Sequence, residues 1–145
     1  MTLSLLLRAA GASLIVLSLL HAVLWRTLAW GRETERLSPL NARVFAVHTF
    51  FIAFVLGALG LLSLFEPELL LAPSELGRLL LMGIVAFWIV RLVIQPLVFD
   101  PVMRLGWTQS RLVRVGVSLL WAIYVAVYGA ALLGQLGADL GLEGR

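Results

Sequence analysis

The 145-residue sequence contains no cysteine and no lysine. The absence of cysteine excludes disulfide bonds, thiolate metal sites, c-type haem attachment and cysteine nucleophiles. The absence of lysine excludes Schiff-base chemistry. Charged residues make up only 13% of the chain, whereas a soluble domain typically has about 25%. The composition therefore argues against a soluble domain and restricts the chemistry available to any site.

Apolar residues make up 61% of the chain and are concentrated in four long runs. A spanning helix needs roughly 20 apolar residues to cross a hydrocarbon core ~30 Å thick. We expect transmembrane helices at about residues 3–25, 44–65, 79–99 and 113–136. These runs use nearly the whole length, so we predict a single transmembrane domain. The expected fold is an all-α, membrane-embedded antiparallel four-helix bundle. We expect the first run to be a helix rather than a signal peptide, because no A-x-A-like site follows it.

Seven of the eleven arginines lie in the first and third connections between these runs. They are Arg26, Arg32, Arg36, Arg43, Arg104, Arg111 and Arg114. The second connection has three glutamates, at positions 66, 68 and 75, against Arg78 alone. The positive-inside rule places the arginine-rich connections in the cytoplasm, with both chain termini outside. We therefore predict a multi-pass protein of an inner (cytoplasmic) membrane.

The net charge of +3 would favour nucleic-acid binding in a soluble chain. Here the charge lies in short juxtamembrane connections, where positive residues set the orientation of the helices and contact anionic lipid. We therefore expect membrane lipids as partners, and no nucleic acid.

Two connections carry helix-capping patterns. Ser38-Pro39 has the form of an N-cap followed by proline at the first helical position. Ser74-Glu75 offers a cap and an acidic residue beside the positive helix end. We also expect a short turn from Asp100-Pro101 to Gly106, with Thr108 or Ser110 capping the last helix.

The last run has small residues at an unbroken four-residue spacing. They are Ser118, Ala122, Ala126, Ala130 and Gly134. Small residues in register allow helix backbones to approach closely in a membrane, so this stripe predicts a packing face. Another face carries Trp121, Tyr124 and Tyr128, which suit aromatic packing or interfacial anchoring, or the lining of a site for a flat ligand. The second run has a weaker small set at positions 53, 57 and 60.

Polar residues inside the runs fall near one depth under the predicted topology. His21 and His48 each lie about one helical turn, ~6 Å, below the cytoplasmic edge. Gln95 and Ser118 fall near the same level, and Arg91 lies one turn deeper. Polar groups within membrane helices usually face the bundle interior and mark functional positions. The sequence therefore predicts a polar layer formed by all four helices near the cytoplasmic face.

Arg91 is the most costly member of this layer, at about 2.5–3.5 kcal/mol for arginine at mid-helix. Gln95 at i+4 is expected to accept a hydrogen bond from it, and Trp88 at i−3 to offer a cation–π face. No acidic residue lies within the four runs. One hypothesis is that an anion completes the site, such as a lipid phosphate, a ligand carboxylate or a haem propionate. The alternative is that the side chain extends toward the interface and braces the third connection.

His21 and His48 have four interpretations. They are polar residues bonded to backbone or serine near the interface, paired axial ligands of a b-type haem, contacts to a quinone or lipid, or ligands of another metal. Catalysis is less expected, because no membrane carboxylate is available to orient a general base.

The segment Leu37–Phe50 and the Asp100-Pro101 pair resemble uncharacterised bacterial four-helix membrane proteins. The resemblance implies a bacterial origin and a four-helix layout, with no activity to transfer. The favoured function is a structural or accessory membrane subunit or a lipid-contacting bundle, with other subunits or a second copy as partners. The alternative is a haem-based electron-transfer module or a quinone- or lipid-binding module.

Overall fold

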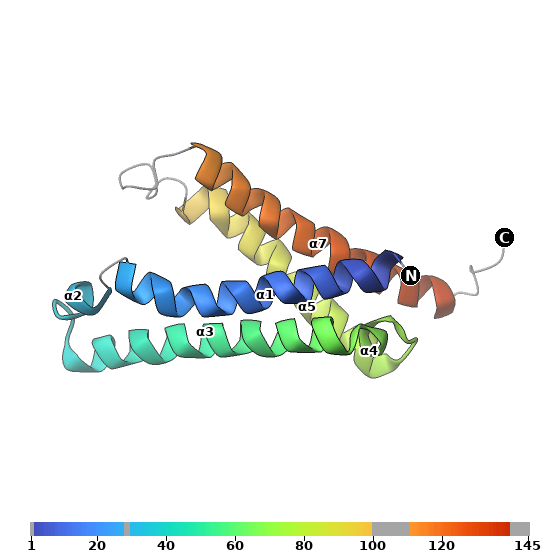
Figure 1. Cartoon of the computed structure of the whole chain (residues 1–145), viewed down its shortest axis with the longest axis horizontal. Helices are drawn as coiled ribbons and strands as arrows, with labels where there is room; N and C mark the ends of the chain where they lie inside the picture. Colours follow the sequence, from blue (N-terminus) through green and yellow to red (C-terminus); the bar gives the residue numbers. More distant parts are fainter. Residues whose placement is uncertain (1, 28–29, 100–110, 140–145) are drawn as a thin grey trace. The chain divides into compact units, whose positions relative to one another are not determined.

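The computed structural model describes residues 2–27, 30–99 and 111–139. All four long helices fall within these ranges: α1 (Thr2–Thr27), α3 (Pro39–Phe65), α5 (Glu75–Ile94) and α7 (Arg111–Asp139) (Figure 1). Two short helices, α2 (Trp30–Thr34) and α4 (Pro67–Leu71), lie between them. No strand occurs in the described part of the chain. The all-α prediction is therefore confirmed.

Each long helix is long and apolar enough to cross a membrane, and the candidate spans are Thr2–Trp25, Pro39–Phe65, Glu75–Phe99 and Arg111–Gly137. Large apolar side chains remain exposed along these helices. Leu19, Phe54, Leu79 and Leu133 are each more than 60% exposed. Contiguous exposed apolar surface of this extent is typical of a lipid-facing surface. The structure thus supports a membrane protein with four spanning helices.

Both predicted N-caps that fall on described residues are confirmed. The hydroxyl of Ser38 accepts a hydrogen bond from the Asn41 amide, and Pro39 opens α3. The hydroxyl of Ser74 accepts one from the Gly77 amide at the start of α5. Because Ser38 caps it, α3 begins at Pro39, five residues before the start of the apolar run at residue 44. The expected turn at 100–106 and the cap at Thr108 or Ser110 lie outside the described residues, as does Arg104.

A single π-helical turn, η1 (Gln95–Phe99), follows α5. Proline at position 96 has no amide hydrogen and its ring clashes with the carbonyl four residues earlier. A wider turn relieves that clash without ending the helix. The third helix, which was expected over residues 79–99, therefore changes from α-helical to π-helical geometry at Gln95.

The chain contacts divide the protein into two compact units. One, called here the α1–α3 unit, is Leu7–Pro67, and the other, the α5–α7 unit, comprises Met1–Leu6 and Glu68–Arg145. Each unit is described below by itself. The predicted single domain and the bundle of all four helices stay predictions.

Glycines bring α1 and α3 together. A Cβ added to Gly11 would lie 2.6 Å from the Leu64 amide nitrogen and 2.7 Å from the Gly60 carbonyl oxygen. Seven residues along α1, the Ser18 hydroxyl donates to the Ala53 carbonyl oxygen at 2.7 Å. The contacts move forward along α1 as they move backward along α3, so the two helices are antiparallel. Gly57 and Gly60 of the weaker small set belong to this contact, and Gly11 was not anticipated.

Aromatic residues pack α5 against α7. Trp88 stacks on Trp121 with ring centroids 5.2 Å apart and lies 4.4 Å from the Tyr124 ring. At the far end of the pair, Gln135 donates from Nε2 to the Leu70 carbonyl oxygen at 2.7 Å. The aromatic residues of α7 therefore serve in packing, the first of the two roles proposed for them.

The second half of the small-residue stripe of α7 does not make this contact. Ala126, Ala130 and Gly134 are exposed, and nothing lies within 4 Å of a Cβ added to Gly134. Trp121 and Tyr124, rather than these three residues, pack against Trp88 of α5. Packing of the stripe against a helix outside this pair stays a prediction.

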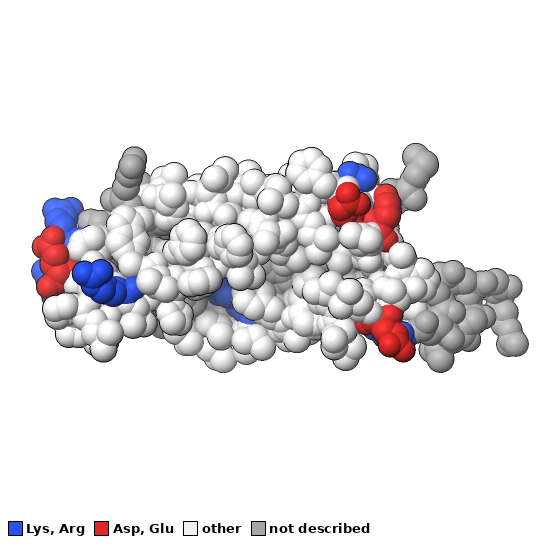
Figure 2. Space-filling view, turned by 90° about the horizontal axis from the view of Figure 1, so that it is seen from below, with Lys and Arg blue, Asp and Glu red and all other residues white. Residues whose placement is uncertain are grey.

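Charged residues lie near the helix ends. Within the long helices, the described charged residues other than Arg8 and Arg91 lie close to one end of their helix; arginines are blue and acidic residues red in Figure 2. An uncharged band flanked by charge is the distribution that a spanning helix requires, because a charge within the hydrocarbon core is costly.

Candidate functional site

The side chain of Arg91 is held within the α5–α7 unit. Its Nη1 donates to Gln95 Oε1 at 3.1 Å, as the i, i+4 spacing predicts. The same oxygen accepts a hydrogen bond from Trp121 Nε1 at 3.2 Å. Gln95 is 1% exposed, so this amide oxygen is a buried acceptor shared by two donors. The sequence did not predict the Trp121 bond, because it depends on which face of α7 meets α5.

The cation–π partners of Arg91 differ from the one expected. Its guanidinium carbon lies 4.5 Å from the centroid of the Phe99 ring and 4.7 Å from that of Trp121. Trp88, the expected partner, instead stacks on Trp121 and packs against the tilted ring of Tyr124. The wide turn η1 carries Phe99 to the guanidinium, and helix pairing supplies Trp121. Aromatic faces and one amide oxygen thus offset part of the cost of this charge. The missing-anion hypothesis for Arg91 stays a prediction.

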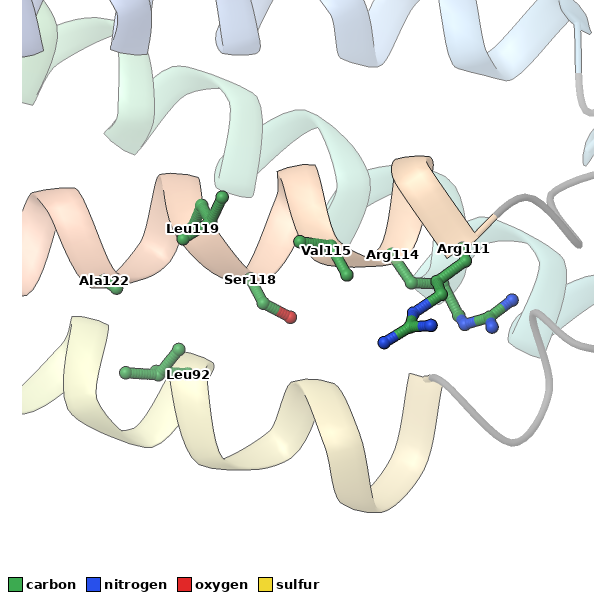
Figure 3. A pocket seen from close by; sticks show the side chains of 7 residues that line it. All are labelled: Leu92, Arg111, Arg114, Val115, Ser118, Leu119 and Ala122. Carbon is green, nitrogen blue, oxygen red and sulfur yellow. The ribbon is translucent and has the colours of Figure 1, made fainter.

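A groove of about 460 Å³ lies between α5 and α7. Two arginines and a serine of α7, Arg111, Arg114 and Ser118, line it together with Leu92 of α5. Apolar residues of α7 complete the lining: Val115, Leu119 and Ala122. Figure 3 shows both guanidinium groups and the serine hydroxyl directed from α7 toward the space beside α5. The groove therefore joins a cationic end to an apolar wall.

The electrostatics of the cationic end favour an anion. Arg111 and Arg114 belong to the first turn of α7, where the helix dipole is positive and disfavours cations. An anion in the groove would interact with two guanidinium groups and the dipole at once.

Sequence reasoning assigned these residues to other roles. Arg111 and Arg114 served only as topology markers, and Ser118 was placed in the packing stripe and the polar layer. Their spacing of i, i+3 and i+7 puts all three on one helix face, and this pattern in the sequence could have predicted that they share a site. Arg91 and Gln95 do not line this groove. The polar layer formed by all four helices stays a prediction.

The two histidines bond to their own helices. His21 Nδ1 lies 2.8 Å from the Leu17 carbonyl oxygen, and His48 Nδ1 lies 3.2 Å from that of Val44. His48 is exposed, whereas His21 is partly buried. Among the described residues, no group of three or more His, Cys, Asp or Glu side chains is placed to hold a metal ion. Paired haem ligation by His21 and His48 stays a prediction.

Comparison with protein-family models, curated proteins and solved structures finds no match to this chain. The site's own geometry therefore carries the functional argument.

Proposed function

We propose that this membrane protein binds an anionic phospholipid in the groove between α5 and α7. The observation that carries the proposal is the convergence of Arg111, Arg114 and Ser118 at one end of a groove whose remaining wall is apolar. This polarity matches a phospholipid, which joins a phosphate to acyl chains. It develops the predicted lipid-contacting bundle into a specific site.

The cationic end suits a phosphate in particular. Guanidinium groups donate two parallel hydrogen bonds to phosphate oxygens, and charge-assisted bonds of this kind are about twice as strong as neutral ones. The Ser118 hydroxyl adds a further donor on the same helix face. A third stabilising contribution comes from the positive end of α7.

The apolar wall suits the acyl chains. Leu92, Val115 and Leu119 continue the groove along the helices, away from the arginines. Under the predicted topology the arginines lie at the cytoplasmic surface, whose leaflet carries anionic lipid. The bound lipid would then have its headgroup at the interface and its chains in the hydrocarbon core. The accessory-subunit role and the predicted protein partners remain compatible with this site.

Native mass spectrometry tests the proposal directly. The purified protein is titrated with phosphatidylglycerol or phosphatidylcholine in mild detergent, and the lipid-bound fraction is measured. We compare Arg111→Gln/Arg114→Gln with Arg36→Gln/Arg43→Gln, which removes the same charge from exposed positions of the α1–α3 unit. The groove variant should bind phosphatidylglycerol at least about tenfold more weakly, because two charge-assisted bonds are lost.

The control variant should bind phosphatidylglycerol as the unmodified protein does. An equal loss of phosphatidylglycerol binding in both variants would show that binding depends only on general charge attraction, and would refute the proposal. A competition with glycerol phosphate, which has no acyl chains, identifies the source of the phosphate. Displacement of lipid by glycerol phosphate at equal concentration would mean that the groove recognises free phosphate esters rather than lipid.

A further inference from the structure

A second groove, of about 340 Å³, lies between α1 and α3. Residues of both helices line it: Ser18, Leu19, His21, Ala22, Trp25, Ala46, Thr49, Phe50 and Ala53. All of them belong to the α1–α3 unit, so the groove shares no residue with the proposed phospholipid site. Its volume lies within the ~300–1,000 Å³ typical of small-molecule pockets. Its polar groups carry the argument that follows.

The two hydroxyl groups of the groove have their hydrogens already engaged. Ser18 donates to the Ala53 carbonyl oxygen at 2.7 Å. Thr49 donates to the Phe45 carbonyl oxygen at 2.9 Å. A hydroxyl has one hydrogen and two lone pairs, so each oxygen can still accept a bond but cannot donate another. Both groups therefore present acceptors to a ligand.

His21 adds a third acceptor. Its Nδ1 lies 2.8 Å from the Leu17 carbonyl oxygen. Because a carbonyl oxygen only accepts, Nδ1 must carry the hydrogen, and in the neutral ring Nε2 then carries a lone pair. Nε2 makes no contact with that carbonyl, and its lone pair is the acceptor that His21 can offer to a ligand in the groove that it lines.

Aromatic rings form the rest of the recognition surface. Trp25 and Phe50 line the groove from α1 and α3. Trp25 is held in place by Phe45 and Trp30, whose ring centroids lie 6.0 Å and 6.1 Å from its own. Immobilised aromatic side chains favour stacking by a flat ring. The Trp25 indole nitrogen is the one side-chain donor among the described groove residues besides the engaged hydroxyls and imidazole.

We propose that this groove binds the hydroquinone headgroup of a membrane quinol. A hydroquinone supplies two O–H donors to a groove rich in acceptors, a flat ring for the aromatic side chains, and an apolar tail that partitions into the membrane. An oxidised quinone has only carbonyl oxygens, which would face the lone pairs of His21, Ser18 and Thr49. The groove therefore discriminates between the two oxidation states by hydrogen-bond polarity. The proposal concerns binding and includes no electron transfer.

His48 provides a matched control on α3. It makes the same type of bond to its own helix, from Nδ1 to the Val44 carbonyl oxygen, at 3.2 Å. Its side chain is exposed and is not among the residues that line the groove. Substitution of His48 therefore changes an equivalent side chain without touching the proposed site.

Anaerobic titration calorimetry with decylubiquinol and decylubiquinone tests the proposal in detergent-solubilised protein. The reduced form should bind at least about tenfold more tightly, because several hydrogen bonds are made only by its hydroxyls. His21→Phe should remove most of this preference, and His48→Phe should leave it unchanged. Thr49→Val, nearly identical in shape to the original side chain, should weaken quinol binding about fivefold and leave quinone binding unaltered.

Thr49→Val keeps the test decisive if His21→Phe fails to fold. Equal affinity for the two oxidation states, or absence of binding by the unmodified protein, would overturn the proposal. So would an equal effect of the His48 and His21 substitutions. Phosphatidylglycerol binding by the same samples reports on the other groove, so failure of one proposal is distinguishable from failure of the other.

Discussion

Gln95 of α5 and Trp121 of α7 are joined by a hydrogen bond of 3.2 Å. The same Gln95 oxygen accepts from Arg91, so one buried amide connects a charge within a candidate membrane span to the neighbouring helix. Loss of the amide would leave two donors without this partner in an apolar setting.

Gln95→Leu should lower the free energy of unfolding by about 1–3 kcal/mol, because buried donors left without an acceptor bear a desolvation cost. Unfolding in bicelles by denaturant titration measures the change. Gln95→Glu keeps an acceptor oxygen for both donors, replaces the amide NH2 with a second oxygen and adds a negative charge beside Arg91, so it should retain stability at neutral pH. Unchanged stability in Gln95→Leu would show that the shared acceptor contributes nothing.

Gly11→Ala should destabilise the protein by about 1–3 kcal/mol, because overpacking at a tight contact forces the backbones apart. The added Cβ would lie 2.6 Å from a backbone nitrogen of α3. Gly83→Ala is the matched control, since nothing lies within 4 Å of a Cβ at that position. Alanine favours helix over glycine by ~1 kcal/mol, so the control should be neutral or stabilising. Equal melting temperatures for the two variants would contradict the close α1–α3 contact.

Ser74→Ala should cost about 1 kcal/mol, because it removes the hydroxyl that accepts from the Gly77 amide at the start of α5. Ser38→Ala should cost less, since its bond to the Asn41 amide is longer, at 3.4 Å against 3.0 Å. Thermal unfolding of the two variants under one set of conditions gives the comparison. A larger loss for Ser38→Ala would contradict the ranking by bond length.

Cysteine labelling tests the predicted topology, because the native chain has no cysteine to interfere. Leu37→Cys lies in the first connection and Ala72→Cys in the second, and both positions are exposed. A membrane-impermeant maleimide added to intact spheroplasts should label Ala72→Cys, and should label Leu37→Cys only after permeabilisation. The reverse pattern would invert the topology and place the Arg111–Arg114 groove at the outer surface.

Local features followed from spacing along the chain. The four spans, the caps at Ser38 and Ser74, and the bond between Arg91 and Gln95 each depend on residues within one helix or one helix end. A pattern within a single helix is encoded by its own 3.6-residue period. These features were therefore predicted from the sequence and are confirmed.

Tertiary contacts followed from the sequence only in part. The guanidinium of Arg91 lies over the rings of Phe99 and Trp121, whereas Trp88 was the ring expected from spacing along the chain. Arg8 of α1 donates to the Leu64 carbonyl oxygen at 2.7 Å near the end of α3, a bond that depends on how the two helices pack. Carbonyls in the last turn of a helix lack intrahelical donors, so arginine suits that position.

The amino-acid sequence determined that the protein is helical, apolar and built to span a membrane four times, because hydrophobic length and helix-end chemistry are local properties. Tertiary structure decided which faces meet. Trp121 and Tyr124 of α7 pack against Trp88 of α5, and large rings of this kind bury more area than small side chains. The same helix pairing places Arg111, Arg114 and Ser118 beside Leu92, where they line the groove on which the proposed function rests.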